Sequence, residues 1–431
     1  MRLIGNMEVK DNVLYIGEVS TEDLVKEYKT PLYVIDEKLV RDKCKRYYKA
    51  FEAHKNNKVT YAGKAFLTLA MCQIIDSEGL YLDVVSDGEL YTALKSGFPM
   101  EKIYFHGNNK TLEEIEMGVD LGVGRFVVDN LYEMEKINSL AKEKNKVQKV
   151  LLRVTPGIEA HTHDYIKTGQ IDSKFGFTMI NGETIYMIKK AMNLSNIEFV
   201  GIHCHIGSQI FETKPYEDEV EVMLNLVRKI KDETGYEVEE LDLGGGFGIY
   251  YTPGDKPKTV EDFCDVILKK AEAKSRELNI KLPSLIIEPG RSIIGNAGTT
   301  LYTIGAIKEI PGVRKYVSVD GGMADNIRPA LYNALYECAI ANRVEDGFQE
   351  VVTIAGKSCE SGDVLIKDVQ LPEVKTGDIL AVFTTGAYGY SMANNYNKIP
   401  IPPVVLVKDG ESKLISKRQS FYDMIQNEIM L

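Results

Sequence analysis

The chain has 431 residues, a length that allows two or three domains of roughly 150 residues, or a barrel of about 250 residues with a smaller second domain. Hydrophobic residues make up 44% and charged residues 27% of the sequence, which excludes a disordered, collagen-like or coiled-coil protein. The 52 Lys and Arg against 63 Asp and Glu give a net charge of −11, the wrong sign for a protein that coats nucleic acid. A few local cations and backbone amides could still bind a phosphate.

The first residues, MRLIGNMEVKDN, lack the continuous apolar core of a secretory signal. No later stretch approaches the roughly 18 apolar residues of a membrane span. The six cysteines are scattered without paired spacing, which is typical of a reducing compartment. We therefore expect a cytoplasmic protein with neither a membrane nor nucleic acid as a partner.

Short β-rich runs alternate with helical patterns over most of the first two thirds of the chain. Helical periodicity fills the segments between them, as in 111–121, 131–144, 184–192 and 217–231. Eight β-rich runs can be counted, at 59–62, 81–85, 103–105, 126–128, 150–154, 199–203, 239–243 and 285–288. Eight β/α alternations predict a (β/α)8 barrel, the TIM-barrel fold, rather than an open doubly wound sheet.

The sequence after residue 291 has a different texture, with short strands separated by Gly, Asp and Pro. Predicted strands there include 316–319, 350–355 and 379–383, and KIPIPP at 398–403 predicts an extended edge. The opening segment, with strands expected at 12–16 and 32–36, is too short to fold alone. We expect a barrel over 37–283 and a mainly β domain formed by 1–36 together with 284–431.

A lysine follows the first barrel strand, in YAGKAF (61–66). Active sites of such barrels lie at the C-terminal ends of the strands. Partial desolvation there would lower the pKa of Lys64 and suit its amine to Schiff-base chemistry. A solvated lysine in a loop is the alternative interpretation.

The sixth strand ends in HCHIGSQ (203–209). Alternation along a strand places His203 and His205 on one face and Cys204 on the other, with no fourth ligand nearby, so we expect no metal. A flat group stacked on His205, with an anion held by Ser208 and nearby amides, fits this motif better.

The last two strands end in GGGFG (244–248) and EPGR (288–291). The glycines allow close approach of backbone N–H groups to a phosphate, although a flexible turn is the alternative. Glu288 follows an apolar strand, where an unpaired carboxylate is costly, so it needs a cation. That cation is either Arg291 or a protonated ring nitrogen.

These four features describe one ligand: a lysine for an aldehyde, an imidazole for a ring face, glycines for a phosphate and a carboxylate for a ring nitrogen. Pyridoxal phosphate carries all four groups. A barrel enzyme that acts on phosphorylated sugars is the alternative, and it would be colourless.

Seven motifs occur in the order of a known family: YAGKAF, SKFG (173–176), HCHIGSQ, GGGFG, EPGR, CESGD (359–363) and GAYG (386–389). On these motifs the chain resembles the diaminopimelate decarboxylase family. That family belongs to the alanine-racemase-like, fold type III pyridoxal-phosphate-dependent decarboxylases, with ornithine and arginine decarboxylases. The chain departs from many relatives at Phe66, where Asn is common, and at Asp87, where Gly is more usual; neither position carries the chemistry.

The resemblance implies decarboxylation of meso-2,6-diaminopimelate to L-lysine and CO2, the last step of lysine biosynthesis. It implies that Lys64 binds the cofactor as a Schiff base, that His205 stacks on its ring, and that Cys359 of a second subunit donates a proton. The remaining cofactor-binding residues would be Ser208, Gly245, Gly246, Glu288, Pro289, Gly290, Arg291 and Tyr388. The protein would be a homodimer with shared active sites.

Substrate choice depends on the number of charges at the distal end. Diaminopimelate carries a distal carboxylate and a distal ammonium, whereas ornithine carries the ammonium alone. The relatives' pattern supplies Arg291, Arg328, Tyr332 and Tyr388 around the substrate, and Glu360 for the ammonium. Arginine suits a bidentate grip on a carboxylate. Ornithine, arginine or a carboxylated polyamine stay open as substrates, as does a binding-only protein, against which the presence of Lys64 and Cys359 counts.

Overall fold

The computed structural model describes residues 2–52, 56–157 and 173–431. Contacts within the chain divide it into two compact units. The barrel unit comprises residues 43–249 and 256–292, and the β unit comprises residues 1–42, 250–255 and 293–431.

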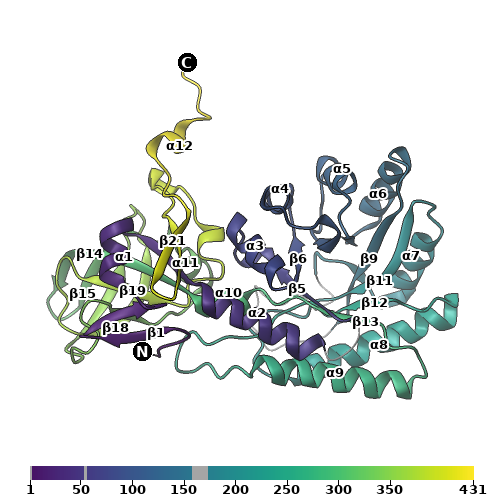
Figure 1. Ribbon diagram of the computed structural model, residues 1–431, viewed down its shortest axis with the longest axis horizontal. Helices are drawn as coiled ribbons and strands as arrows, with labels where there is room; N and C mark the ends of the chain where they lie inside the picture. Colours follow the sequence, from purple (N-terminus) through teal and green to yellow (C-terminus); the bar gives the residue numbers. More distant parts are fainter. Residues whose placement is uncertain (1, 53–55, 158–172) are drawn as a thin grey trace. The chain divides into compact units, whose positions relative to one another are not determined.

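Eight parallel strands close the barrel, as the sequence predicts (Figure 1). Strand β8 pairs with β9, and β13 returns to pair with β5, so the ring has no open edge. A short strand, β10 (Phe177–Thr178), extends the sheet beside β9. In ring order the eight strands are β5 (Lys58–Ala62), β6 (Tyr81–Val84), β7 (Ile103–Phe105), β8 (Arg125–Val128), β9 (Gln148–Thr155), β11 (Ile197–His203), β12 (Glu240–Asp242) and β13 (Ser284–Ile287).

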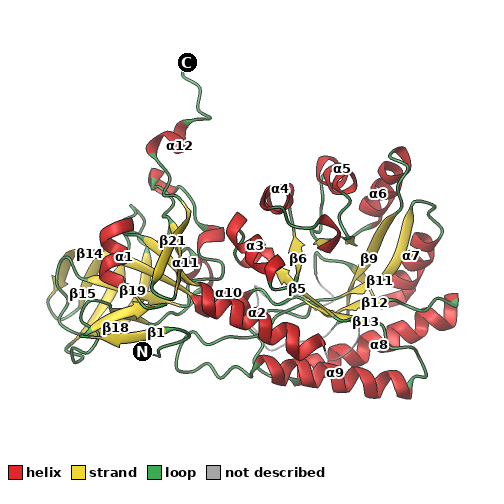
Figure 2. Ribbon diagram, viewed as in Figure 1, coloured by secondary structure: helices red, strands yellow, loops and turns green. Residues whose placement is uncertain are grey.

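Helices surround these strands in the barrel unit (Figure 2). Thr111 and Thr259 each begin a helix with a reciprocal capping box, which satisfies the first backbone N–H groups. The helices are α3 (Leu69–Ser77), α4 (Asp87–Ser96), α5 (Leu112–Leu121), α6 (Leu131–Glu143), α7 (Glu183–Met192), α8 (Lys214–Thr234) and α9 (Val260–Glu277), while α2 (Glu37–Glu52) leads into the unit.

The interior of the barrel is filled by side chains. Tyr104, Val127, Leu151, Val200 and Ile286 form a buried cluster contributed by five strands. The Tyr104 hydroxyl donates to Oε2 of Glu240 at 3.1 Å, and that carboxylate also pairs with Lys58 of β5 and Arg125 of β8. The filled interior leaves the carboxyl ends of the strands as the place for chemistry.

The β unit is built around strand β4 (Leu32–Asp36) from the opening segment. This strand pairs antiparallel with β14 (Gly298–Ile310) and parallel with β20 (Val404–Lys408). The opening segment therefore pairs with the C-terminal part of the chain, as expected. The sheet continues through β15 (Arg314–Val319), β17 (Glu350–Ala355) and β18 (Val364–Leu371) on one side and β21 (Glu411–Ser416) on the other.

Further elements complete this unit. Strand β19 (Ile379–Phe383) pairs with β14 and with β16 (Cys338–Ile340). A separate three-stranded sheet consists of β1 (Met7–Lys10), β2 (Val13–Ile16) and β3 (Val19–Ser20), and helix α1 (Thr21–Tyr28) follows it. The core of the unit includes Leu14, Val34 and Leu301, which brings the opening and later segments into one hydrophobic cluster.

The extended edge predicted at 398–403 is not a strand, although Ile399 is extended and Pro403 O accepts a hydrogen bond from Tyr33 N of β4 at 3.1 Å. Tyr396–Lys398 form a 3-10 turn, and the following residues form no strand until β20 begins at Val404. Prolines at positions 400, 402 and 403 lack the N–H donor that a strand ladder needs. Within the described ranges, none of the helices combines the length and apolar character needed to cross a membrane.

Candidate active site

Lys64 lies in a 3-10 turn, Gly63–Ala65, directly after strand β5, and its side chain is exposed. The turn is fixed to neighbouring strand ends, because Ala62 N donates to Pro289 O at 3.3 Å. A Cβ on Gly63 would lie 2.7 Å from the Asp83 carbonyl oxygen. The backbone that carries Lys64 is therefore packed against the ends of β6 and β13.

Glu288 lies at the end of β13 and is 6% exposed. Its two carboxylate oxygens each face a buried histidine. Nε2 of His106 lies 2.8 Å from Oε1, at an angle that departs from hydrogen-bond geometry, and Nε2 of His203 lies 3.3 Å from Oε2. Glu288 is thus bracketed by two imidazoles.

The charges in this cluster follow from burial and proximity. Burial raises the pKa of Glu288, but the two histidines outweigh it and hold the pKa well below its usual range. Burial lowers the pKa of His203 to about 3. Burial, with the adjacent Glu288 charge, raises the pKa of Asp242 well above its usual range. At neutral pH the centre of the site is an anionic Glu288 beside a neutral His203, and burial favours the protonated form of the adjacent Asp242.

The expectation that His203 has no further metal-type ligands nearby is wrong. Ligand atoms of His106, His203, Asp242 and Glu288 all lie within 4.8 Å of one another. The sequence argument compared only adjacent motif positions, whereas these residues follow four different strands.

His205 has a different environment from His203, because it is only half-buried. Gly245 N donates to its Nδ1 at 3.3 Å, which leaves Nε2 as the protonated nitrogen of the neutral ring. Burial, then the positive charges of Lys64 and Arg153, hold the pKa of His205 well below its usual value. This position therefore offers a neutral, flat ring, as predicted for stacking.

The glycines of GGGFG are required by close backbone packing. A Cβ on Gly245 would lie 2.1 Å from the Glu288 carbonyl oxygen. Gly246 has φ +95°, and its Cβ would lie 2.4 Å from the Gly207 carbonyl oxygen. The hydroxyl of Tyr216, on α8, donates to Gly245 O at 3.3 Å. The loops after β11, β12 and β13 thus touch through backbone atoms, which only glycine permits.

Ser208 and Arg291 lie together, with Arg291 Nη2 donating to Ser208 Oγ at 3.1 Å. Arg291 is 9% exposed, so a positive charge is held close to the glycine loops. A hydroxyl, a guanidinium and glycine amides suit a phosphate. The buried, ionised carboxylate of Glu288 suits a protonated ring nitrogen, because its Oε1 accepts no hydrogen bond from the described residues. The donor set therefore fits pyridoxal phosphate.

The loop that carries SKFG is attached to the same end of the barrel. Gly176 N donates to Oδ2 of Asp129 at 2.9 Å, and the Arg153 guanidinium lies 4.2 Å from the centre of the Phe175 ring. Thr155 Oγ1 donates to Phe175 O at 2.7 Å. The described part of this loop is thus held by the ends of β8 and β9.

Five further polar residues around this site were not predicted from the sequence: His106, Asp83, Asp242, Arg153 and Asp129. A signal for most of them was present, because His106 and Asp129 directly follow predicted strand runs and Asp242 lies within one. A polar side chain at the end of a buried barrel strand is as informative as the motifs themselves.

The other predicted site residues belong to the β unit. Arg328 begins α11 (Arg328–Tyr332) and is 8% exposed. Its Nη1 donates to the hydroxyls of Tyr251 at 3.2 Å and Tyr336 at 2.7 Å, and its guanidinium lies 5.9 Å from the centre of the Tyr388 ring. Tyr332 and Tyr388 are half-buried. The structure thus brings Arg328 and Tyr388 together.

Cys359 and Glu360 occupy an exposed loop between β17 and β18. Cys359 N donates to Asn397 Oδ1 at 2.9 Å. The buried carboxylate of Asp363 accepts from Met323 N at 2.7 Å and Ser358 N at 2.9 Å, and it therefore anchors the loop. Asp363 is part of the CESGD motif, but its anchoring role was not predicted.

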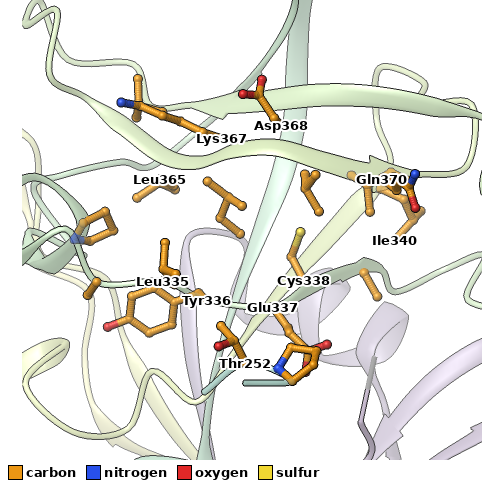
Figure 3. A pocket seen from close by; sticks show the side chains of 18 of the residues that line it. Thr252, Leu335, Tyr336, Glu337, Cys338, Ile340, Leu365, Lys367, Asp368 and Gln370 are labelled. Atoms are coloured by element: carbon orange, nitrogen blue, oxygen red, sulfur yellow. The ribbon is translucent and has the colours of Figure 1, made fainter. Parts of the chain in front are cut away.

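A cavity of about 620 Å³ lies elsewhere in the β unit, with side chains of β16 and β18 on either side of it (Figure 3). Cys338, Leu365 and Tyr336 contribute to its walls. Among the described residues that line it, none is a predicted site residue. This cavity and the barrel site are therefore separate features.

Comparison with known proteins decides the family. Residues 37–295 match the family model for the pyridoxal binding domain of pyridoxal-dependent decarboxylases. The chain is 51% identical over 417 residues to the diaminopimelate decarboxylase of Bacillus subtilis, covering 96% of this chain and 95% of that protein. The chain belongs to the diaminopimelate decarboxylase family. The family member from Bacillus methanolicus is 53% identical over 94% of both chains.

Solved structures of the family agree. The diaminopimelate decarboxylase of M. jannaschii in complex with L-lysine matches with a TM-score of 0.93 and 38% identity, covering 100% of this chain and 99% of that one. A lysine/ornithine decarboxylase from Vibrio vulnificus, at 22% identity and a TM-score of 0.76, shares the fold. The predicted family, fold and pyridoxal cofactor are confirmed.

Proposed function

We propose that this chain decarboxylates meso-2,6-diaminopimelate to L-lysine and CO2 with pyridoxal phosphate, the last step of lysine biosynthesis. The observation that carries the proposal is the buried, anionic Glu288 at the mouth of a pyridoxal-binding barrel. A carboxylate at this position favours a protonated ring nitrogen, as decarboxylation requires. The chain is 51% and 53% identical to two named diaminopimelate decarboxylases over nearly its full length, which supports the choice of substrate.

The barrel residues would hold the cofactor in the roles that the sequence predicts. Lys64 would bind its aldehyde, His205 would contact its ring face, and Glu288 would pair with its ring nitrogen. Phosphate and edge contacts would come from Ser208, Gly245, Gly246, Pro289, Gly290, Arg291 and Tyr388. When bound, pyridoxal phosphate supplies an electron sink for the electron pair released as CO2 leaves.

The protein's part in this chemistry is to place charge. Ionised Glu288 holds a proton at the ring nitrogen, while neutral His205 adds no competing positive charge to the ring face. Both effects are stronger in a buried site than in water, because the effective dielectric constant is lower.

Arg328 supports a substrate with a distal carboxylate. It is a buried cation whose described hydrogen-bond partners are two tyrosine hydroxyls rather than an acid. A buried charge without a counter-ion is costly, and an anionic ligand removes that cost. We propose that Arg328, with Arg291 and Tyr332, binds the distal carboxylate, that Glu360 binds the distal ammonium, and that Tyr388 also contacts the substrate.

We further propose that Cys359 donates the proton that replaces CO2, and that it acts in the active site of a second subunit of a homodimer. All six cysteines lie among the described residues, and none is in a disulfide; five are buried, and only Cys359 is exposed. An exposed thiol on an anchored loop can reach another subunit. The absence of disulfides also supports a cytoplasmic location.

Substrate specificity is tested with the purified protein. We expect CO2 release from meso-diaminopimelate, little or none from ornithine, arginine or carboxylated polyamines, and a visible absorption band that borohydride abolishes. The Lys64→Ala variant should lose both the band and the activity. Release from ornithine but not from diaminopimelate would exclude the proposed substrate, and a colourless protein that cannot be reconstituted would exclude the cofactor.

A further inference from the structure

Two buried histidines beside Glu288 have no role in the mechanism described above. His106 follows β7 and is 5% exposed, and His203 ends β11 and is 1% exposed. Their ring centroids lie 5.0 Å apart, with an angle of 75° between the planes. Nε2 of each ring lies close to a different oxygen of the same carboxylate, at 2.8 Å for His106 and 3.3 Å for His203. The pair therefore defines the direction in which Glu288 points.

The proton positions follow from the contacts. A carboxylate only accepts hydrogen bonds, so a nitrogen 2.8 Å or 3.3 Å from its oxygens must carry the proton. Nδ1 of His203 is buried and has no hydrogen-bond partner among the described residues, which is consistent with a proton on Nε2. Both imidazoles thus present an N–H group to Glu288 and stabilise its ionised form.

Other charged groups act on the same carboxylate. Asp83 from β6, Arg153 from β9 and His205 after β11 interact with Glu288 electrostatically. Asp242 from β12 does so too and also shares a side-chain hydrogen bond with Glu288, while Lys64 after β5 acts on Asp83. Asp83 Oδ1 lies 4.0 Å from His106 Nε2, so a second carboxyl group lies near that ring. Among the described residues, His106 and His203 are the two whose ring nitrogens contact the Glu288 carboxylate.

We propose that His106 and His203 are positioning residues that keep Glu288 ionised and turned toward the ring nitrogen of bound pyridoxal phosphate. This inference rests on the proposed function, because it assigns Glu288 to that nitrogen. Glu288 and the ring nitrogen would share one proton. Without the N–H groups of His106 and His203, an ionised Glu288 in a buried site is less stable, so the proton would move from the ring nitrogen to the carboxylate. The histidines therefore determine that the proton stays on the cofactor.

The test uses substitutions at His106 that differ only in the donor they offer. His106→Gln keeps an N–H near the position of Nε2, whereas His106→Asn is too short and His106→Leu has no donor. Tyr104→Phe is the matched control. Tyr104 lies on β7, the strand directly before His106, and this variant loses a buried hydrogen bond of 3.1 Å to Glu240 but no contact with Glu288. His203→Gln and His203→Leu repeat the comparison on the other oxygen.

Three readouts distinguish positioning from general stability. They are kcat and KM for diaminopimelate, the affinity of the cofactor-free protein for pyridoxal phosphate, and the pH dependence of the visible spectrum of the holoenzyme. For the Leu and Asn variants we expect kcat to fall roughly 10- to 100-fold with a smaller change in KM, as when partners that orient a functional group are lost. Cofactor affinity should weaken, and the spectrum should change at a shifted pH. The Gln variants and Tyr104→Phe should resemble wild type.

The proposal would be overturned if the His106→Leu variant had the same kcat, cofactor affinity and spectrum as the wild type. If His106→Leu does not fold, the Gln and Asn pair decides, and equal behaviour of these two variants would count against it. Stoichiometric zinc in the purified wild type, displaced by pyridoxal phosphate, would also overturn it, because Glu288 would then be a metal ligand. If the wild type binds the cofactor but does not decarboxylate diaminopimelate, the substrate proposal fails while affinity and spectrum still test the histidines.

Discussion

The thiol of Cys204 donates to Oε1 of Glu219, 3.1 Å away, and both residues are fully buried in the barrel unit. Cys204 lies between the two histidines of HCHIGSQ, and Glu219 lies on α8. Burial raises the pKa of Glu219 to about 8. This glutamate is therefore protonated at neutral pH, and it links α8 to the strand end that carries the site.

We predict that Glu219 makes the protein less stable as the pH rises. In the unfolded chain a glutamate loses its proton near pH 4.3, whereas folded Glu219 keeps it up to about pH 8. Its stability contribution is thus fully present below the unfolded pKa and is lost as the pH rises through the folded pKa, by at most about 1.4 kcal/mol per pH unit. Denaturant unfolding of wild type and Glu219→Gln at pH 5.5, 7 and 8.5 measures this effect. The wild type should lose more stability than the variant, and parallel pH curves would contradict the prediction.

We predict that Gly245→Ala disrupts the cofactor site. The new Cβ would lie 2.1 Å from the Glu288 carbonyl oxygen, so the backbone that carries Glu288 must move. Overpacking of this kind costs about 1–3 kcal/mol. We expect a lower melting temperature and weaker binding of pyridoxal phosphate, measured by thermal unfolding and cofactor titration. Gly88→Ala is the control, since the nearest atom to its Cβ would be 3.8 Å away; an equal loss in both variants would be evidence against the steric argument.

We predict that Arg328→Lys raises KM for diaminopimelate more than it lowers kcat. A lysine cannot reproduce the planar, bidentate grip of a guanidinium on a carboxylate. The loss of a charge-assisted hydrogen bond of about 1.5–3 kcal/mol corresponds to an increase of roughly 10- to 100-fold in KM. Steady-state kinetics of CO2 release test this, with Tyr336→Phe as a variant that keeps the guanidinium but removes one of its partners. An unchanged KM in Arg328→Lys would show that the distal carboxylate binds elsewhere.

We predict that two inactive variants restore activity when mixed. Lys64→Ala lacks the cofactor lysine and Cys359→Ala lacks the proton donor, so a hybrid dimer contains one site with both residues intact. Activity should recover after subunit exchange, to no more than about a quarter of wild type if the chains mix at random. CO2 release and size-exclusion chromatography measure the outcome. No recovery after demonstrated exchange would place both residues in the same chain's site.

The sequence predicted the parts of the fold that depend on local patterns. All eight barrel strands were found because each is a short apolar run followed by a helical segment, and Lys64, His205 and Glu288 were found because each follows such a run. The resemblance then supplied roles that spacing alone left open, such as those of Arg328 and Cys359.

Features that depend on the ring order of the strands could not be predicted in this way. The contact between His106 and Glu288 joins residues 182 positions apart in the numbering, across strands that meet only when the barrel closes. Strands β20 and β21 were also missed, although the apolar, β-branched run VVLV of β20 is itself a strand signal; the parallel pairing of β20 with β4 is what could not be predicted. Asp363 was missed as an anchor because its partners are backbone amides, which leave no mark on composition.

The position of β4 between β14 and β20 has a consequence for how the protein can be dissected. A central strand supplied by the start of the chain means that no single cut yields two foldable fragments. Cutting after the barrel leaves β4 with neither neighbour and exposes an apolar edge open to aggregation. Separate expression of the β unit would instead require residues 1–42 to be joined to the segment that begins at residue 293 by a designed linker that also supplies residues 250–255, which belong to the same unit.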